Sequence, residues 1–515
     1  MCVAPHASLL FSETGAILRT RTLAAAMAVA TAAAGLSLTL APTASAATSA
    51  ADDFNGDGIA DLVVATPDAP VDGHVNAGSV TVLYGSADGV SPARSTTLTQ
   101  NSPGVPGDAG SHDLFGTSHA AGDLDADGYT DLVVGAPGDA VPYSQSFGTL
   151  TVLWGSATGL TGDGVSIASP LASSQWDAEK EYGKKVVVAD LDGDGTPQLA
   201  ALSRTNLWAY DDLAGRTAPT DARYSESFAP YIQPRTLTAG DFAGAGRAQL
   251  VVTGSENCDG TAGGCRYTGV HTWGDYGLEP VSLPDPGGDV SGTNEAPTVA
   301  TAAGDVDHDG YTDLVTGHVP ASAVTEGEYS DAAGFVHVRY GSAEGLGAHR
   351  TATLDQDATG VPGRSESGDN FGASVAVGDV TGDGYADVAV GVPGKTVRGV
   401  SGTGATVLLK GTATGLTGTG AQTLHQTTDG VPDTAEADDW FGSAVAVTDL
   451  DGDGAADVTV AAKGEDVFAG SVRDGGDWVL RGSATGLTTS GAASFSAQSF
   501  GFTHPDAEFG SVLGG

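Results

Sequence analysis

Short runs in which apolar residues alternate with small or polar ones recur along the whole chain. Ser79–Tyr84 and Ser374–Asp379 are two examples, and this period of two is typical of β-strands with one buried face. A second kind of run, such as Asp131–Pro137, is almost continuously apolar and indicates a strand that is buried on both faces. Glycine, aspartate, asparagine and proline separate the runs. The pattern therefore predicts an all-β fold of short strands and tight turns.

The predicted strands belong to a repeated unit. The segment Phe371–Gly394 recurs as Phe115–Gly138 and begins again at Phe441, and a second block, of which Gly78–Val90 is one copy, belongs to the same unit. With a last strand such as Ser95–Gln100, each unit contains about four strands, which is the content of one propeller blade.

An acidic loop marks each unit. The first aspartates of these loops lie 51 to 74 residues apart, at Asp53, Asp123, Asp190, Asp241, Asp305, Asp379 and Asp449. The period exceeds that of WD-type propellers, and the WD signature is missing. We therefore predict a seven-bladed β-propeller, in which the fourth blade, about 202–292, is degenerate.

The two ends of the chain complete this picture. Residues 1–46 contain two arginines, an apolar stretch and the small residues Ala44-Ser45-Ala46, which predict a signal peptide and a secreted, extracellular protein. The propeller would then occupy 47–515. In the repeats, a strand that begins with Phe-Gly (FG) precedes the acidic loop. The first acidic loop has no such strand before it, whereas the FG strand 509–515 has no acidic loop after it. We expect this last strand to complete the first blade and close the ring.

The acidic loops have the chemistry of calcium sites. They follow the pattern Asp-x-(Asp/Asn)-x-Asp-Gly-x-x-Asp, which supplies side-chain oxygens at positions 1, 3, 5 and 9 and a main-chain carbonyl at position 7. The glycine permits the positive φ that turns the chain. The four complete loops contain Asp53, Asn55, Asp57, Ile59 and Asp61; Asp123, Asp125, Asp127, Tyr129 and Asp131; Asp305, Asp307, Asp309, Tyr311 and Asp313; and Asp449, Asp451, Asp453, Ala455 and Asp457.

The other loops depart from the pattern. The sixth loop has Thr381 at position 3, with Asp379, Asp383, Tyr385 and Asp387, and we expect it to bind calcium less tightly. The third loop has Gln198 at position 9, after Asp190, Asp192, Asp194 and Thr196. The amide oxygen of Gln198 can ligate calcium but carries no charge, so the sequence leaves calcium binding by this loop undecided. The fourth loop retains only Asp241, and we expect no metal there. The expectation is five calcium sites and a possible sixth.

EF-hands begin in the same way but require a glutamate at position 12 and flanking helices. Position 12 here lies in predicted strands and is occupied by Val64, Val134, Thr316, Val390 and Val460. The EF-hand interpretation therefore fails.

Charge and cysteine content narrow the possible partners. The formal charge is -43, from 64 acidic and 21 basic residues, which argues against binding to nucleic acid or to anionic membranes. No segment after the signal peptide is long and apolar enough to span a bilayer. Cys258 and Cys265 are close in the sequence of an exported chain, and we predict that they form a disulfide.

No residue pattern indicates a catalytic centre. Ser118, Ser374, Ser443 and Ser511 repeat at one offset from FG, which marks a framework position. The scattered histidines are expected in loops or solvent, at His112, His119, His271, His318 and His425. Trp154 is predicted in the core. Some of the other aromatic residues could line a ligand surface, namely Trp176, Trp208, Trp273, Trp440 and Tyr143.

The combination of FG, acidic loop and GAP, as in Phe115-Gly116, Asp123–Asp131 and Gly135-Ala136-Pro137, resembles the FG-GAP repeat of integrin α-subunit propellers. The resemblance extends from Asp53 to the end of the chain and fails in the fourth unit. It implies calcium in the loops of one face, partners on the opposite face, and adhesion or carbohydrate binding more often than catalysis.

The sequence thus favours a monomeric, non-catalytic module that binds an extracellular glycan, cell-wall polymer or protein. The alternative is a propeller hydrolase or lyase that acts on extracellular polysaccharide. Such an enzyme needs a cluster of carboxylate, histidine or tyrosine side chains that does not repeat, and the irregular segment Leu202–Gly292 is the place to look for it.

Overall fold

The computed structural model describes residues 52–141, 145–146, 148–170, 181–211, 213–219, 222, 224–256, 265–274, 277–281, 298–319, 333–467, 473–502 and 507–514. The predicted signal peptide, 1–46, and Cys258 of the predicted disulfide lie outside these ranges.

The described chain forms seven four-stranded antiparallel sheets. The first sheet contains β30 (Val512–Gly514), β1 (Leu62–Thr66), β2 (Ser79–Leu83) and β3 (Ser95–Leu98). The second contains β4 (Ser118–Gly122), β5 (Asp131–Ala136), β8 (Thr149–Leu153) and β9 (Gly164–Ala168). The third contains β10 (Lys185–Ala189), β11 (Gln198–Leu202), β12 (Asn206–Tyr210) and β13 (Tyr224–Ser227).

The fourth sheet contains β14 (Ile232–Gly240), β15 (Gln249–Glu256), β16 (Cys265–Gly274) and β17 (Gly277–Val281). The fifth contains β18 (Thr298–Gly304), β19 (Asp313–His318), β20 (Phe335–Arg339) and β21 (Thr351–Leu354). The sixth contains β22 (Val375–Gly378), β23 (Asp387–Val392), β24 (Ala405–Lys410) and β25 (Thr417–Leu424). The seventh contains β26 (Phe441–Thr448), β27 (Asp457–Ala462), β28 (Gly476–Arg481) and β29 (Thr488–Ser496). A small hairpin, β6 (Ala140–Val141) and β7 (Gln145–Ser146), and a 3-10 helix, η1 (Ala497–Phe500), complete the elements.

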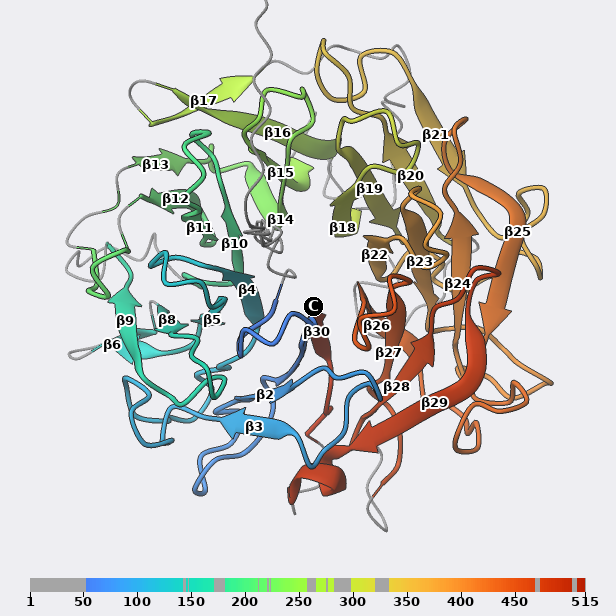
Figure 1. Cartoon of the computed structure of the whole chain (residues 1–515), viewed down its shortest axis with the longest axis horizontal. Helices are drawn as coiled ribbons and strands as arrows, with labels where there is room; N and C mark the ends of the chain where they lie inside the picture. The colour runs from blue at the N-terminus through green and yellow to red at the C-terminus, as the bar shows by residue number, and fades with distance from the viewer. Residues whose placement is uncertain are drawn as a thin grey trace, which may run out of the picture. The chain divides into compact units, whose positions relative to one another are not determined.

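The sheets are the blades of a seven-bladed β-propeller, as predicted. The innermost strands contact one another in the order β4, β10, β14, β18, β22, β26, β30 and back to β4, and Figure 1 shows them around the centre of the ring. The predicted closure is also confirmed, because β30 pairs with β1 and places Leu513 opposite Val64. The first blade is therefore assembled from both ends of the chain.

Burial follows the two sequence patterns. The almost continuously apolar runs form the second strand of each blade, and all five residues of β1 and all six of β5, β19, β23 and β27 are buried. The FG phenylalanines pack between blades and are 0 % exposed, at Phe115, Phe371, Phe441 and Phe509. These apolar contacts supply the main driving force for stacking blade on blade.

The fourth sheet is shorter than the segment 202–292 that was assigned to the fourth unit. Residues 206–227 form β12 and β13, which pair within the third sheet. The boundary was misplaced because the third blade lacks the glycine-rich turn that follows the third strand in five of the other blades.

Strand direction gives each blade two distinct ends. Each acidic loop leads into the second strand of a blade, and the turns between third and fourth strands lie at the same end of an antiparallel sheet. We call this end the acidic face. Hairpins between second and third strands, and the connections from one blade to the next, lie at the other end, which we call the opposite face.

Candidate metal centres

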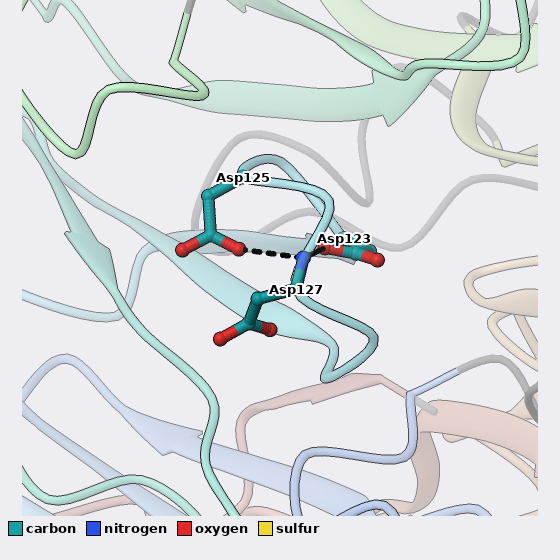
Figure 2. Close-up of side chains that lie close together, drawn as sticks. All are labelled: Asp123, Asp125 and Asp127. Carbon is teal, nitrogen blue, oxygen red and sulfur yellow. Dashed lines mark hydrogen bonds between the residues drawn. The ribbon is translucent and has the colours of Figure 1, made fainter.

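Each acidic loop is wound around the carboxylate at its first position. In the first loop, Asp53 accepts hydrogen bonds from the main-chain nitrogens of Gly56, Asp57 and Gly58 at 2.7, 3.1 and 2.8 Å. In the second loop, Asp123 accepts from the nitrogens of Asp127 and Gly128 at 3.1 and 3.0 Å. The Asp127 nitrogen also lies 3.1 Å from Asp125 Oδ1 (Figure 2).

This winding brings the predicted ligands together. Oxygen atoms of three carboxylates lie within 4.8 Å of one another in four of the loops, which contain Asp123, Asp125 and Asp127; Asp190, Asp192 and Asp194; Asp305, Asp307 and Asp313; and Asp449, Asp451 and Asp453. In the first and sixth loops, Asn55 and Thr381 replace one of the carboxylates. Thr381 Oγ1 lies 3.4 Å from Asp379 Oδ1.

The aspartate at position 9 has a second role that connects two parts of a blade. Asp131 accepts hydrogen bonds from the nitrogens of Leu124, inside its own loop, and of Gly155, after the third strand, both at 2.9 Å. Asp61 and Asp313 are held in the same way. These carboxylates therefore tie the acidic loop to the neighbouring turn of the acidic face.

Burial raises the pKa of the position 9 carboxyl groups. Asp61, Asp131, Asp313 and Asp457 all have a pKa raised to about 7, chiefly because they are removed from water, and the other loop carboxylates raise it further. The pKa of Asp387 is raised for the same first reason. Without a cation, a buried carboxylate among other carboxylates is therefore costly.

The partner of position 9 is a glycine that sequence reasoning did not assign to the site. It begins the Gly-Ser/Thr turn after the third strand, and its nitrogen lies 2.8–3.0 Å from the carboxylate, at Gly85, Gly155, Gly341, Gly411 and Gly482. A Cβ on Gly155 would collide with the carbonyl oxygen of Thr130. The signal was present in the sequence as the recurring GSADG, GSATG, GSAEG and GTATG, in the same five units that have an aspartate at position 9.

The acidic loops also join each blade to the next. The carbonyl of Asp53 accepts a hydrogen bond from the nitrogen of Thr130 in the following loop at 3.1 Å, and the carbonyl of Phe54 accepts one from Ser156 of the following turn at 3.2 Å. Equivalent loop-to-loop bonds start at Asp190, Asp241, Asp305 and Asp379. The loops therefore form a nearly continuous belt on the acidic face.

The third and fourth loops differ in geometry as well as sequence. Gln198 accepts from the Leu191 nitrogen at 2.6 Å, and its Nε2 donates to the carbonyl of Thr196 at 2.8 Å. That carbonyl is the predicted ligand at position 7, so the amide directs a donor where a cation needs an oxygen. In the fourth loop, Asp241 accepts only from the nitrogens of Ala245 and Gly246, both at 2.8 Å.

A basic side chain reaches the carboxylates of each loop that has an aspartate at position 9. Arg94 lies 3.5 Å from Asp57, and Lys410 lies 3.3 Å from Asp387. The other ion pairs join Arg216 to Asp125 and Asp127, Arg350 to Asp307, and Arg481 to Asp451. Each of these loops thus holds more negative charge than its own main chain neutralises.

The residues fit a calcium ion. The donors are all oxygens, from carboxylates, amide or hydroxyl groups and main-chain carbonyls, which are the ligands that a hard cation prefers. Two buried carboxylate oxygens, Asp307 Oδ1 and Asp457 Oδ2, have no hydrogen-bond partner. A bound cation would supply the charge that these oxygens lack.

The expectation that the histidines lie in loops or solvent needs correction for three of them. His119, His271 and His318 lie in strands β4, β16 and β19 rather than in loops or solvent. His271 is 1 % exposed and His318 stacks on Phe335 with ring centroids 4.8 Å apart. Removal from water lowers the pKa of His119 to about 4. The expectation was wrong because imidazole was assumed to prefer water.

The tryptophans are mostly packing residues. Trp154 is in the core as predicted, at 3 % exposure, and Trp208 and Trp273 are each 5 % exposed. Trp440 is half-buried, with Lys463 and Arg473 over its ring. Trp176 and Tyr143 lie outside the described residues.

Comparison with known proteins identifies the repeats. Residues 45–83, 115–153, 298–338, 371–409 and 441–476 match the FG-GAP repeat family. The chain is also 32 % identical over 147 residues to human (Homo sapiens) phosphatidylinositol-glycan-specific phospholipase D, and 31 % identical over 147 residues to the bovine (Bos taurus) protein. Each match covers 28 % of this chain and 17 % of the relative, so the chain spans less than a fifth of the length of these relatives.

Among solved structures, the Dos1 propeller matches 70 % of this chain and 68 % of its own, with a TM-score of 0.39 and 10 % identity.

Within the described part of the chain, no helix has the length and hydrophobicity needed to cross a membrane.

Proposed function

Because the chain carries five FG-GAP repeats in a seven-bladed β-propeller, we propose that it is a secreted, monomeric, calcium-binding module that holds an extracellular ligand without transforming it. Calcium would occupy the five acidic loops that have an aspartate at position 9. Its role there is structural, because a cation relieves the repulsion among the loop carboxylates and thereby strengthens the belt that joins the blades.

One observation supports the opposite face as the ligand surface. The large apolar side chains that are exposed in the described chain all lie there: Val75 at 52 %, Tyr231 at 56 %, Val281 at 38 % and Val400 at 37 %. The acidic face repeats from blade to blade, whereas the hairpins between second and third strands on the opposite face differ in sequence. A surface that varies around a rigid frame is suited to recognition of a glycan, a cell-wall polymer or a protein.

A hydrolase or lyase acting on polysaccharide is the second candidate. The irregular part of the chain does contain a cluster that does not repeat, in which His271 Nδ1 lies 2.8 Å from Glu226 Oε2. Burial, with the carboxylates of Glu226 and Glu256, raises the pKa of the nearby Tyr267 to about 12. However, His271 is 1 % exposed, which favours a packing role over contact with a polymer.

The test is binding of the chain from Ala47 onward to an array of glycans, cell-wall polymers and extracellular proteins. We expect a ligand that is bound in calcium, is released by chelator and is recovered unchanged. The Tyr231→Ser and Val75→Ser variants should weaken binding, whereas Ala87→Ser, an exposed change on the acidic face, should not. Cleavage of the bound polymer would support the enzyme instead, and equal binding by all variants would place the ligand elsewhere.

A further inference from the structure

A second kind of cation position lies on the opposite face, and the sixth blade shows it filled by a lysine. Lys395 Nζ donates to Asp369 Oδ2 at 2.7 Å, to the carbonyl of Arg364 at 2.8 Å and to Gln356 Oε1 at 3.3 Å. The side chains of Lys395 and Asp369 are 13 % and 2 % exposed. An ammonium group is therefore enclosed by three oxygens of different kinds.

The seventh blade repeats this arrangement with the lysine replaced by an acid. Alignment of the repeats places Gln426, Thr434, Asp439 and Glu465 at the positions of Gln356, Arg364, Asp369 and Lys395. The main-chain bond that holds the aspartate is kept, since Asp439 accepts from the Glu436 nitrogen at 2.6 Å, as Asp369 accepts from Glu366 at 3.0 Å. The seventh blade thus keeps the oxygen-bearing groups, but Glu465 replaces the lysine that they surround in the sixth blade.

Among the described residues, no basic side chain forms an ion pair with Glu465 or Asp439. Glu465 is 6 % exposed and Asp439 is 1 % exposed. Desolvation, with the carboxylates of Asp439, Asp433 and Glu436, raises the pKa of Glu465 to about 8. Desolvation and like charges also raise the pKa of Asp439 to about 6.

The amide of Gln426 leaves one polar atom unpaired, as do the equivalent amides of Gln100 in the second blade and Gln356 in the sixth. Gln426 is 2 % exposed, and its Nε2 donates to Glu465 Oε2 at 2.6 Å, while its Oε1 has no hydrogen-bond partner. In the sixth blade the same amide is turned the other way, because its oxygen accepts from Lys395. A cation beside Glu465 would favour rotation of the Gln426 amide so that its oxygen faces the cation. The Gln356 oxygen faces Lys395 in this way.

Space for an ion is present at this position. A cavity of about 360 Å³ is lined by Glu465, Glu436, Asp433, Asp466 and Thr434, with Trp478 and Phe495 among its other walls. In the second blade the acid at this position, Asp139, is instead held by the Thr149 hydroxyl at 2.7 Å and by Gln100 at 3.2 Å. The seventh blade has Gly476 near the place of that hydroxyl and offers no such donor.

We propose that the cavity of the seventh blade binds a divalent cation of the calcium type through Glu465, Asp439, the amide oxygen of Gln426 and the carbonyl of Thr434. A divalent ion is favoured over an ammonium because two inner carboxylates replace the single one that Lys395 neutralises. Asp433, Glu436 and Asp466 add negative charge at the mouth of the cavity. This site is separate from the acidic loops, because it lies at the opposite ends of the strands.

The Glu465→Lys variant tests the proposal, since it restores the arrangement of the sixth blade and should fold. The number of calcium ions bound by the chain from Ala47 onward is measured by equilibrium dialysis at mildly alkaline pH. We expect Glu465→Lys to bind one ion fewer than the parent protein, and Glu465→Gln to bind that ion at least tenfold more weakly. Glu279→Lys, the same change at an exposed residue of β17, is the control and should bind the full number.

The outcomes separate this site from the loops. If the loops bind no calcium, the parent protein still binds one ion and Glu465→Lys binds none. Equal numbers of ions in the parent and in both Glu465 variants would overturn the proposal. Binding of a primary amine such as n-butylamine in place of calcium, abolished by Glu465→Lys, would also overturn it and assign the cavity to an ammonium.

Discussion

Asp477 is a buried acid at the seam where the ring closes. It is 0 % exposed, neither of its carboxylate oxygens has a hydrogen-bond partner, and it contacts Gly510 of the closing segment. Complete burial raises the pKa of Asp477 well above its ordinary value. Thr406 occupies the aligned position in the sixth blade, so the fold does not require an acid there.

Replacement of Asp477 by threonine should stabilise the protein at neutral pH. A carboxyl group whose pKa is higher in the folded state favours folding fully below its unfolded pKa, and loses that contribution as the pH rises toward the folded value, by at most about 1.4 kcal/mol per pH unit. The melting temperature of Asp477→Thr should therefore exceed that of the parent increasingly from mild acid to neutral pH. Asp108→Thr, an exposed change, is the control. A difference that does not vary with pH would mean that Asp477 is charged in the folded protein.

The glycine of the Gly-Ser turn is required by a close approach of two main chains. A Cβ on Gly155 would collide with the Thr130 carbonyl and displace the nitrogen that binds Asp131. We expect Gly155→Ala to lower the free energy of unfolding by about 1–3 kcal/mol, the usual cost of overpacking. Gly215→Ala, where the nearest atom to a Cβ is 3.6 Å away, is the control in chemical denaturation. Similar stability of the two variants would show that the close approach at Gly155 does not contribute to holding Asp131.

At the scale of the acidic loop, a single side chain distinguishes the third loop from its neighbours. Gln198 donates a hydrogen bond to the carbonyl of Thr196, the position 7 residue of this loop. In the loops with an aspartate at position 9, the side chain at that position has no such donor. We predict that Gln198→Asp increases the number of bound calcium ions by one, as measured by equilibrium dialysis. Gln249→Asp in the fourth loop should add none, because Ala243 and Ala245 supply no oxygens. An unchanged number with Gln198→Asp would show that more than position 9 is missing.

The loops were predictable because each set of ligands lies within nine residues, so spacing alone fixes which oxygens converge. The groups that complete each loop were not predictable in this way. Arg216 is 91 residues from Asp125, and the Gly155 nitrogen reaches Asp131 only because β8 lies beside β5. The repeats established which segments are equivalent, but contacts between blades depend on the geometry of the ring. The buried histidines were missed because their environment is set by neighbouring strands.

At the scale of the molecule, stability depends on closure of the ring as well as on the blades. The last segment fills two gaps, because β30 pairs with β1 while Phe509 enters the core between the seventh and first blades. The Phe509 nitrogen donates to the Asp474 carbonyl at 2.8 Å, and its ring stacks on Phe500 with centroids 5.3 Å apart. The acidic belt follows the same circuit, since the carbonyl of Leu450 in the seventh loop accepts from Ser86 of the first blade at 3.2 Å.

Loss of the closing contacts should therefore weaken the whole propeller and its calcium sites together. Phe509→Ala removes a side chain that is 0 % exposed and should cost about 3–5 kcal/mol, the range for deletion of a buried phenylalanine. Phe502→Ala, at a partly buried ring of the same cluster, should cost less. If the ring unfolds as one unit, Phe509→Ala will lower a single melting transition, and chelator will lower it further. A separate, earlier transition confined to the first blade would show instead that the other six blades hold together without closure, as in an open array of repeats.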